Sequence, residues 1–194
     1  MLRSVLALAI VCAAGLVQAA PKLDIILAHG TTAEQKARVQ LQKLLTRHNV
    51  KKWVFTRKIN IQTGQIPHSH PILTLNTRHL RRNDLFLSTF IHEQLHWYLA
   101  RKEKATAAAV ADLRRMYPAI PLGYPEGSAD EESNYHHVIV TFLEYQAGKA
   151  LFGRAGAKKV MDFWSKDRYT WIYKTMLADE AKIRAVLEKH ALII

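Results

Sequence analysis

Residues 83–102 read NDLFLSTFIHEQLHWYLARK and predict the central helix of the fold. Asn83 and Asp84 can cap the start of a helix, and neither proline nor glycine interrupts the stretch that follows. Apolar residues surround the few polar ones, so we expect this helix to be enclosed by protein on most sides. His92 and His96 are four positions apart and therefore lie on one face, one turn from each other.

This spacing allows both imidazoles to reach a single metal ion, and Glu93 follows the first of them directly. Zn²⁺ accepts imidazole ligands and tolerates an open coordination position. Glu93 could then act as a general base toward a water molecule activated by the ion, without being a ligand itself. The pattern predicts a catalytic zinc site that includes His92 and His96. The alternative is a metal-free pair of histidines on an amphipathic helix.

A third ligand is expected from a second apolar helix, where residues 135–148 read YHHVIVTFLEYQAG. Burying Glu144 among apolar neighbours would be costly without a partner, and a metal ion is one such partner. Pairing with a lysine or arginine is the other way to bury it. His137 lies two helical turns before Glu144, about 10.5 Å away, so the two are not expected to bind one ion together. On the residues alone, both stay open as the third ligand.

These two helices together resemble the gluzincin metallopeptidases, the thermolysin-like branch of the zincins. The matching residues are HEQLH at positions 92–96 and EYQA at 144–147, which is similar to the Glu-x-x-Ala helix of that superfamily. The resemblance covers roughly residues 53–151. It implies His92, His96 and Glu144 as zinc ligands and Glu93 as the catalytic base. It also implies an edge strand that pairs with an extended substrate, and residues 71–75 are placed to be that strand.

One position departs from the superfamily pattern and concerns the orientation of the ligands. Four residues after the ligand glutamate, gluzincins often have an aspartate that orients a ligand histidine, and here that position is Gly148. Either another group orients the histidines, or Glu144 is not the third ligand. If Glu144 is the ligand, His137 becomes a candidate for stabilising the oxyanion. Tyr169 and Tyr173 are further candidates for that role, although aromatic residues at this density more often pack a core.

The whole pattern predicts an α+β fold of zincin type. We expect a small antiparallel or mixed sheet, with an edge strand over the HExxH helix, and a mostly helical C-terminal half. Strands are expected at 23–27, 53–61 and 71–75, with a turn at 62–65 joining the last two as a hairpin. Helices are expected from about residue 31 to past 45, and at 83–102, 105–116, 133–151, 157–164 and 177–190. No repeat or linker divides the chain, so residues 20–194 are predicted to form a single metallohydrolase domain.

Residues 1–19 are predicted to be a secretory signal peptide. They combine a basic start at Arg3, an apolar run over 5–17 and small residues before Ala20. An uncleaved anchor is the alternative, although the run is short for a membrane span. The single cysteine, Cys12, would leave with the signal. The protein is therefore expected to be exported, periplasmic or extracellular, with no membrane span after signal removal.

Composition narrows the functional classes. The chain has 194 residues, of which 49% are hydrophobic, and this excludes a disordered protein. Its formal net charge of +12 favours an anionic partner, but no nucleic-acid-binding motif accompanies it, so no nucleic acid is expected. We predict a zinc metallohydrolase that acts on peptide or protein substrates, acidic ones in particular. The alternatives are a zincin-like protein that binds metal or an envelope partner without turnover, and a basic protein that binds an anionic polymer.

Overall fold

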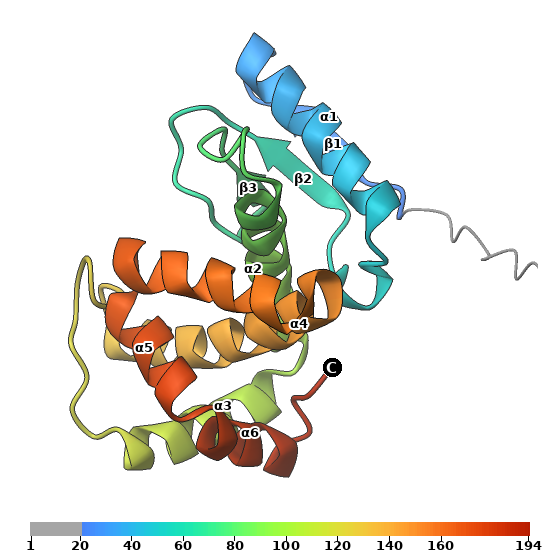
Figure 1. Cartoon of the computed structure of the whole chain (residues 1–194). Helices are drawn as coiled ribbons and strands as arrows, with labels where there is room; N and C mark the ends of the chain where they lie inside the picture. Colours follow the sequence, from blue (N-terminus) through green and yellow to red (C-terminus); the bar gives the residue numbers. More distant parts are fainter. Residues whose placement is uncertain (1–20) are drawn as a thin grey trace, which may run out of the picture.

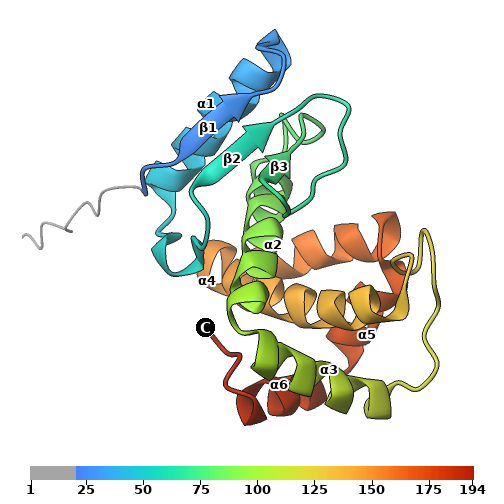
Figure 2. The same ribbon diagram turned by 180° about the vertical axis from the view of Figure 1, so that it is seen from behind.

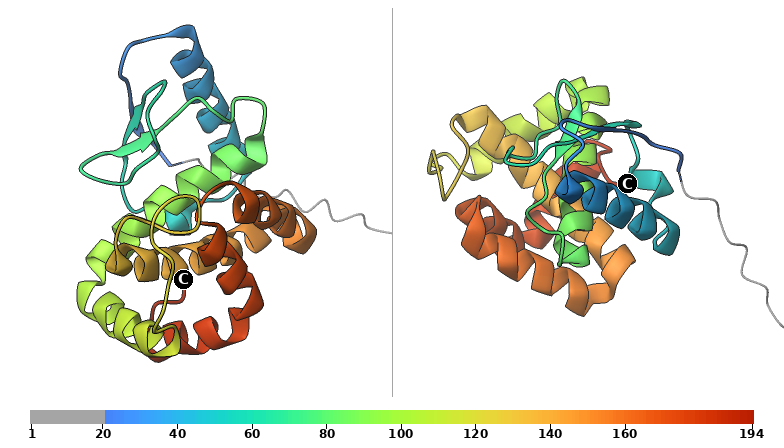
Figure 3. Two further views of the ribbon diagram at one scale, coloured as in Figure 1. Left: turned by 90° about the vertical axis from the view of Figure 1, so that its left-hand side faces the viewer. Right: turned by 90° about the horizontal axis from the view of Figure 1, so that it is seen from above.

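The computed structural model describes residues 21–194, so the predicted signal peptide, residues 1–19, lies outside the described residues. The elements are β1 (Asp24–Leu27), α1 (Thr32–Arg47), the short 3₁₀ helix η1 (Lys51–Trp53), β2 (Lys58–Ile61), β3 (Leu73–Leu75), α2 (Asn83–Arg101), α3 (Glu103–Met116), α4 (Glu131–Asp167), α5 (Thr170–Ala178) and α6 (Glu180–Lys189). The fold is α+β with a mostly helical C-terminal half, as predicted. The sheet and α1 form one lobe, α3 to α6 form the other, and α2 runs between them (Figures 1 and 3).

The sheet of the described residues has the order β1-β2-β3, and its strands are parallel. This corrects the predicted antiparallel or mixed sheet and the predicted hairpin. β1 and β2 are joined by α1, which is the crossover that parallel neighbours require. The link from β2 to β3 first runs back along the outer side of β3, where His68 and Thr74 exchange two backbone hydrogen bonds of 3.1 and 2.8 Å. The chain reverses again before residue 73, so β3 enters the sheet in the same direction as β2.

One face of the sheet belongs to the hydrophobic core. The strand register aligns Ile25, Ile59 and Leu73 in one row across the strands, and Leu27, Ile61 and Leu75 in the next. The β2 and β3 residues in these rows are fully buried. This face packs against α1 and α2, as Figure 2 shows from behind, and it therefore anchors the start of α2 to the first lobe.

The central helix α2 is buried along most of its length, as its sequence predicts. Gln94, inside the HEQLH motif, is fully buried and points away from the metal-binding face. Its side-chain oxygen accepts hydrogen bonds from the backbone N–H groups of Phe55 and Thr56 at 2.7 and 2.8 Å. Its amide nitrogen donates to the Thr56 carbonyl at 2.8 Å. These three bonds attach the segment between η1 and β2 to α2. Residues 54–57 were predicted to belong to the strand at 53–61, but they lie outside β2.

Helix α4 consists of two limbs that correspond to the two helices predicted at 133–151 and 157–164. The break is at Gly153, which has φ 72° and ψ 168°, a conformation that only glycine adopts readily. Beyond it the helix doubles back on itself (Figure 1). A Cβ on Gly148 would lie 3.3 Å from the Ala157 Cβ, so the small residue permits the close approach of the two limbs. The predicted helix at 177–190 is largely α6, and α5 precedes it. Within residues 21–194 no helix combines the length and the apolar character needed to cross a membrane.

Replacing Gln94 with leucine tests the role of this side chain in the fold. The variant leaves two backbone N–H groups and one carbonyl without their partner, and we expect the free energy of unfolding to fall by about 1–3 kcal/mol. Urea denaturation followed by circular dichroism measures this. Gln42→Leu is the matched control, because Gln42 is exposed on α1 and its replacement should change stability by less than about 0.5 kcal/mol. Equal effects of the two substitutions would contradict the assignment.

Candidate metal centre

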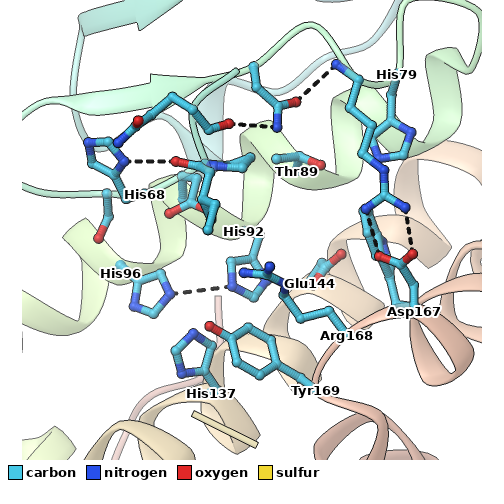
Figure 4. Close-up of a pocket in the computed structure, with 18 of the residues that line it drawn as sticks. His68, His79, Thr89, His92, His96, His137, Glu144, Asp167, Arg168 and Tyr169 are labelled. Atoms are coloured by element: carbon cyan, nitrogen blue, oxygen red, sulfur yellow. Dashed lines mark hydrogen bonds and ion pairs between the residues drawn. The ribbon is translucent and has the colours of Figure 1, made fainter. Parts of the chain in front are cut away.

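Three histidines meet where α2 crosses α4. His92 and His96 come from α2 and His137 comes from the first limb of α4, and one ligand atom of each lies within 4.8 Å of the other two. The Nε2 atoms of His92 and His96 are 3.4 Å apart. The His137 ring centroid lies 5.6 Å from that of His92 and 4.9 Å from that of His96. Figure 4 shows the three rings facing one another at the floor of a cavity.

Glu144 contacts His92 on the nitrogen that faces away from the cluster. The Nδ1 of His92 lies 2.9 Å from Oε2 of Glu144, so it can donate its proton to the carboxylate and leave Nε2 for a metal. The same carboxylate accepts hydrogen bonds from the hydroxyls of Ser88 and Tyr173. Glu144 was predicted as a zinc ligand, and in the structure its oxygens are engaged by these three groups. It occupies the histidine-orienting role for which Gly148 offers no side chain.

His137 was the rival ligand, and the structure places it beside the HEQLH pair. Its Nδ1 lies 2.7 Å from the backbone oxygen of Ser133, one turn earlier on α4. This hydrogen bond fixes the tautomer with the proton on Nδ1, so the lone pair of Nε2 is available to bind a metal ion. The neighbouring His136 is half-buried and is not part of the cluster. The residues therefore form a three-histidine site that could hold a metal ion.

Burial controls the protonation of the cluster. It lowers the pKa of His96 well below its usual value and that of His137 to about 3, so both rings are neutral, which is the form that binds metals. Burial also lowers the pKa of His92, but the hydrogen bond that His92 donates to Glu144 and the negative charge of that carboxylate outweigh this and raise the pKa. Burial raises the pKa of Glu93 to about 7, which suits a group that must accept and release protons near neutral pH.

The histidines open into a cavity of about 680 Å³ between the two lobes. Residues 64–69 and 76–79, which follow β2 and β3, form one wall, and residues from α4 and the start of α5 form the other. Arg78 and Asp167 join the two walls by a bidentate ion pair of 2.8 and 2.5 Å. Because Asp167 ends α4, this ion pair also positions the two residues that follow it, Arg168 and Tyr169.

Tyr169 lies directly against the metal-binding face. Its ring centroid is 4.3 Å from that of His137, and Figure 4 shows its hydroxyl directed toward the histidines. Its backbone is left-handed, with φ 55° and ψ 41°, which is uncommon for a large side chain and costs conformational energy. Both tyrosines predicted as candidates line the cavity, but the Tyr173 hydroxyl donates to Glu144 at 2.9 Å, whereas the Tyr169 hydroxyl is directed toward the histidines.

The predicted substrate-pairing strand differs from the expectation. At Thr74, the backbone groups on the outer edge of β3 are both engaged by His68. The segment that contains His68 therefore forms the wall of the cavity in place of β3. Its position is fixed on α2 by Trp97, whose indole N–H donates to the Ser69 carbonyl at 2.8 Å and whose ring stacks on His70 at 4.3 Å.

Two functional contributors escaped sequence reasoning. Ser88 precedes His92 by four residues and so lies on the same face of α2, a spacing that could have indicated a shared contact. Its hydroxyl donates to Glu144 and accepts from the indole of Trp164 at 3.1 Å. Arg168 lines the cavity beside Tyr169, and no local pattern in the sequence distinguishes it from other surface arginines.

Comparisons with protein-family models, with curated proteins and with solved structures yield no match. The interpretation of the site therefore depends on its own geometry.

Metal analysis of three variants tests the ligand set. We expect His137→Ala to lose stoichiometric zinc, because it removes one of three donor atoms. Glu144→Gln should retain zinc with an affinity lower by about 10–100-fold, since it changes only the group that orients His92. His136→Ala is the matched control and should bind zinc like the wild type. If Glu144→Gln loses zinc while His137→Ala keeps wild-type affinity, Glu144 is the ligand and the assignment is overturned.

Proposed function

We propose that this protein is an exported zinc metallohydrolase of zincin-like type that cleaves peptide bonds. His92, His96 and His137 would hold the zinc ion, and Glu93 would be the general base. One observation carries the proposal: His137 lies beside His92 and His96, and together the three rings could hold one ion. The Nδ1 atoms of His92 and His137 are already hydrogen-bonded to Glu144 and to the Ser133 carbonyl, so the Nε2 atoms of both rings are left for a metal. If His92 and His96 were a pair without a function, no third histidine would be expected beside them. Nor would hydrogen bonds be expected to hold two of the three rings in the tautomer that binds a metal.

The donor set fits zinc in a catalytic rather than a structural site. Three imidazoles leave the fourth tetrahedral position to water or substrate, whereas structural zinc sites are closed by four protein ligands. The absence of cysteine from residues 21–194 excludes a thiolate site in that part of the chain. A bound Zn²⁺ would supply Lewis acidity and lower the pKa of a water molecule. Three neutral imidazoles would leave the double positive charge of the zinc ion uncompensated. The two-histidine, one-glutamate set that the gluzincin resemblance implies would instead place one negative charge on the ion.

The remaining steps depend on side chains of this protein. Glu93 is 6% exposed at the cavity floor, and with a pKa of about 7 it can take a proton from the attacking water and return it to the leaving amine. Tyr169 can donate a hydrogen bond to the oxyanion that forms as the carbonyl is attacked. In this proposal His137 is a metal ligand and not the oxyanion-stabilising group.

The position of Arg168 favours an acidic substrate. Asp167 neutralises Arg78, but no ion pair within residues 21–194 includes Arg168, which lines the same cavity. Its guanidinium lies over the Tyr124 ring, 5.5 Å from the ring centroid, and Figure 4 shows its side chain extending across Tyr169 into the cavity. A guanidinium in a partly enclosed site binds carboxylates through charge-assisted hydrogen bonds. We therefore propose peptides with a carboxylate near the cleaved bond as preferred substrates.

Replacing Glu93 with glutamine separates catalysis from metal binding. The variant keeps the shape of the side chain and all three histidines, so it should bind one equivalent of zinc. Hydrolysis of a peptide library, followed by mass spectrometry, should slow by about 10²–10⁴-fold because the general base is missing. Glu103→Gln, on the exposed start of α3, is the control and should hydrolyse at the wild-type rate. A zinc-loaded wild type that cleaves no peptide would favour the alternative of a binding protein without turnover.

Pairs of peptides that differ by one Glu-to-Gln change test the role of Arg168. The wild type should cleave the acidic member of a pair more efficiently, and Arg168→Gln should reduce this preference by about tenfold, since a hydrogen bond to a charged group contributes about 1.5–3 kcal/mol. Lys166→Gln removes an exposed charge outside the cavity and should leave the preference unchanged. Equal cleavage of both peptides by the wild type would contradict the role of Arg168 but leave the hydrolase assignment intact.

A further inference from the structure

The positive charge of this protein is concentrated in one lobe. Residues 21–82 contain twelve lysines and arginines, against only two acidic residues, Asp24 and Glu34. Residues 83–194 contain fifteen lysines and arginines against fourteen acidic residues, so the helical lobe is nearly neutral. The surplus that composition reveals therefore belongs almost entirely to the sheet and α1.

The parallel topology gathers much of this charge at one end of the lobe. Because α1 returns the chain from the end of β1 to the start of β2, the end of α1, η1 and the starts of both strands lie together, as Figures 1 and 2 show. The last turn of α2 reaches the same place, since Arg101 donates a hydrogen bond to the Phe55 carbonyl. We call this surface the basic end and define it by six exposed cations: Arg47, Lys51, Lys52, Arg57, Lys58 and Arg101.

Ion pairing does not neutralise the basic end. None of its six cations takes part in an ion pair with another residue of the described chain. In the helical lobe, by contrast, exposed cations such as Lys158 and Lys182 pair with acidic residues within one helical turn. Asp24 lies opposite Lys58 in the register of the sheet, but the two side chains are too far apart to form an ion pair. Such a surface attracts an anionic partner.

The form of the basic end distinguishes between anionic partners. Single-stranded nucleic acids bind through exposed aromatic side chains on which bases stack. Trp53, the aromatic residue of η1, is only 4% exposed, and the Arg101 guanidinium lies over Phe55. Among the described residues, Tyr124 is the large exposed aromatic side chain, and it belongs to the loop before α4. Cations spread over the ends of several elements instead fit anionic phospholipid headgroups, whose attraction requires neither a pocket nor stacking.

The basic end and the cavity lie at opposite ends of the strands. β1 begins at Asp24 within the basic end. The cavity lies at the other end of the strands, since its wall residues 64–69 and 76–79 follow β2 and β3. We propose that the basic end docks the protein on bilayers that contain anionic phospholipids, with the cavity facing away from the membrane.

Vesicle sedimentation of residues 20–194, which remain after the predicted removal of the signal peptide, tests the proposal. The protein should bind vesicles of phosphatidylcholine with about one third phosphatidylglycerol more tightly than vesicles of phosphatidylcholine alone, and high salt should abolish the difference. The triple variant Arg47→Gln, Lys51→Gln, Lys52→Gln should weaken binding to the anionic vesicles on the order of a hundredfold. Every protein compared lacks the apolar run over residues 5–17, so binding reports on the surface of the folded domain.

A matched triple variant separates a specific surface from net charge. Lys159→Gln, Lys166→Gln, Lys174→Gln removes the same charge from exposed positions of α4 and α5 and should change vesicle binding only slightly. Equal weakening by both triple variants, or no preference for anionic vesicles, would overturn the proposal. An unlabelled oligonucleotide that displaces the protein from anionic vesicles at equal charge concentration would identify nucleic acid as the partner instead. The zinc content and peptidase rate of the first triple variant should stay unchanged, so this result is independent of the proposed activity.

Discussion

The carboxylate of Glu144 is the group on which the helical lobe and the candidate metal centre both depend. It accepts hydrogen bonds from His92 and Ser88 on α2 and from Tyr173 on α5, and it is itself part of α4. A carboxylate that is 2% exposed must be partnered to be tolerated, so removing any one donor would leave an energetic deficit in the core. The same contacts that bring three helices together therefore orient His92, one of the three histidines that could hold a metal ion.

The elements that the sequence predicts best are those encoded within one helix. The i, i+4 spacing of His92 and His96 and the apolar surroundings of α2 are local, and the structure confirms the helix and its burial. The choice between His137 and Glu144 is not local. Helical spacing places them two turns apart on the same face, but the height at which α4 crosses α2 determines which of them meets the histidines and which lies behind His92. That crossing follows from packing of the whole lobe.

Strand direction was beyond the same kind of reasoning. The turn-forming residues 62–65 predict a reversal correctly, and an antiparallel partner of β3 does exist at His68. The chain then reverses a second time, and the hydrophobic alternation of β3 is the same in either direction, so no local signal distinguishes a parallel from an antiparallel neighbour. Gln94 similarly shows why Phe55 and Thr56 do not belong to a strand: their backbone N–H groups bond to the Gln94 side chain, 39 and 38 positions further along the chain, and not to a neighbouring strand.

The double-backed form of α4 has a consequence for how such a cavity can diversify. Its first limb supplies His137 and Glu144, and its second ends at Asp167 on the rim, so floor and rim are one continuous piece of chain. The spacing between them is set at the far end of the helix, where the two limbs touch at Gly148 and Ala157. Substitutions at that contact would alter the width of the cavity without replacing any residue that lines it. Evolution, or a protein engineer, could thereby resize the cavity while His92, Glu93, His96 and His137 stay unchanged.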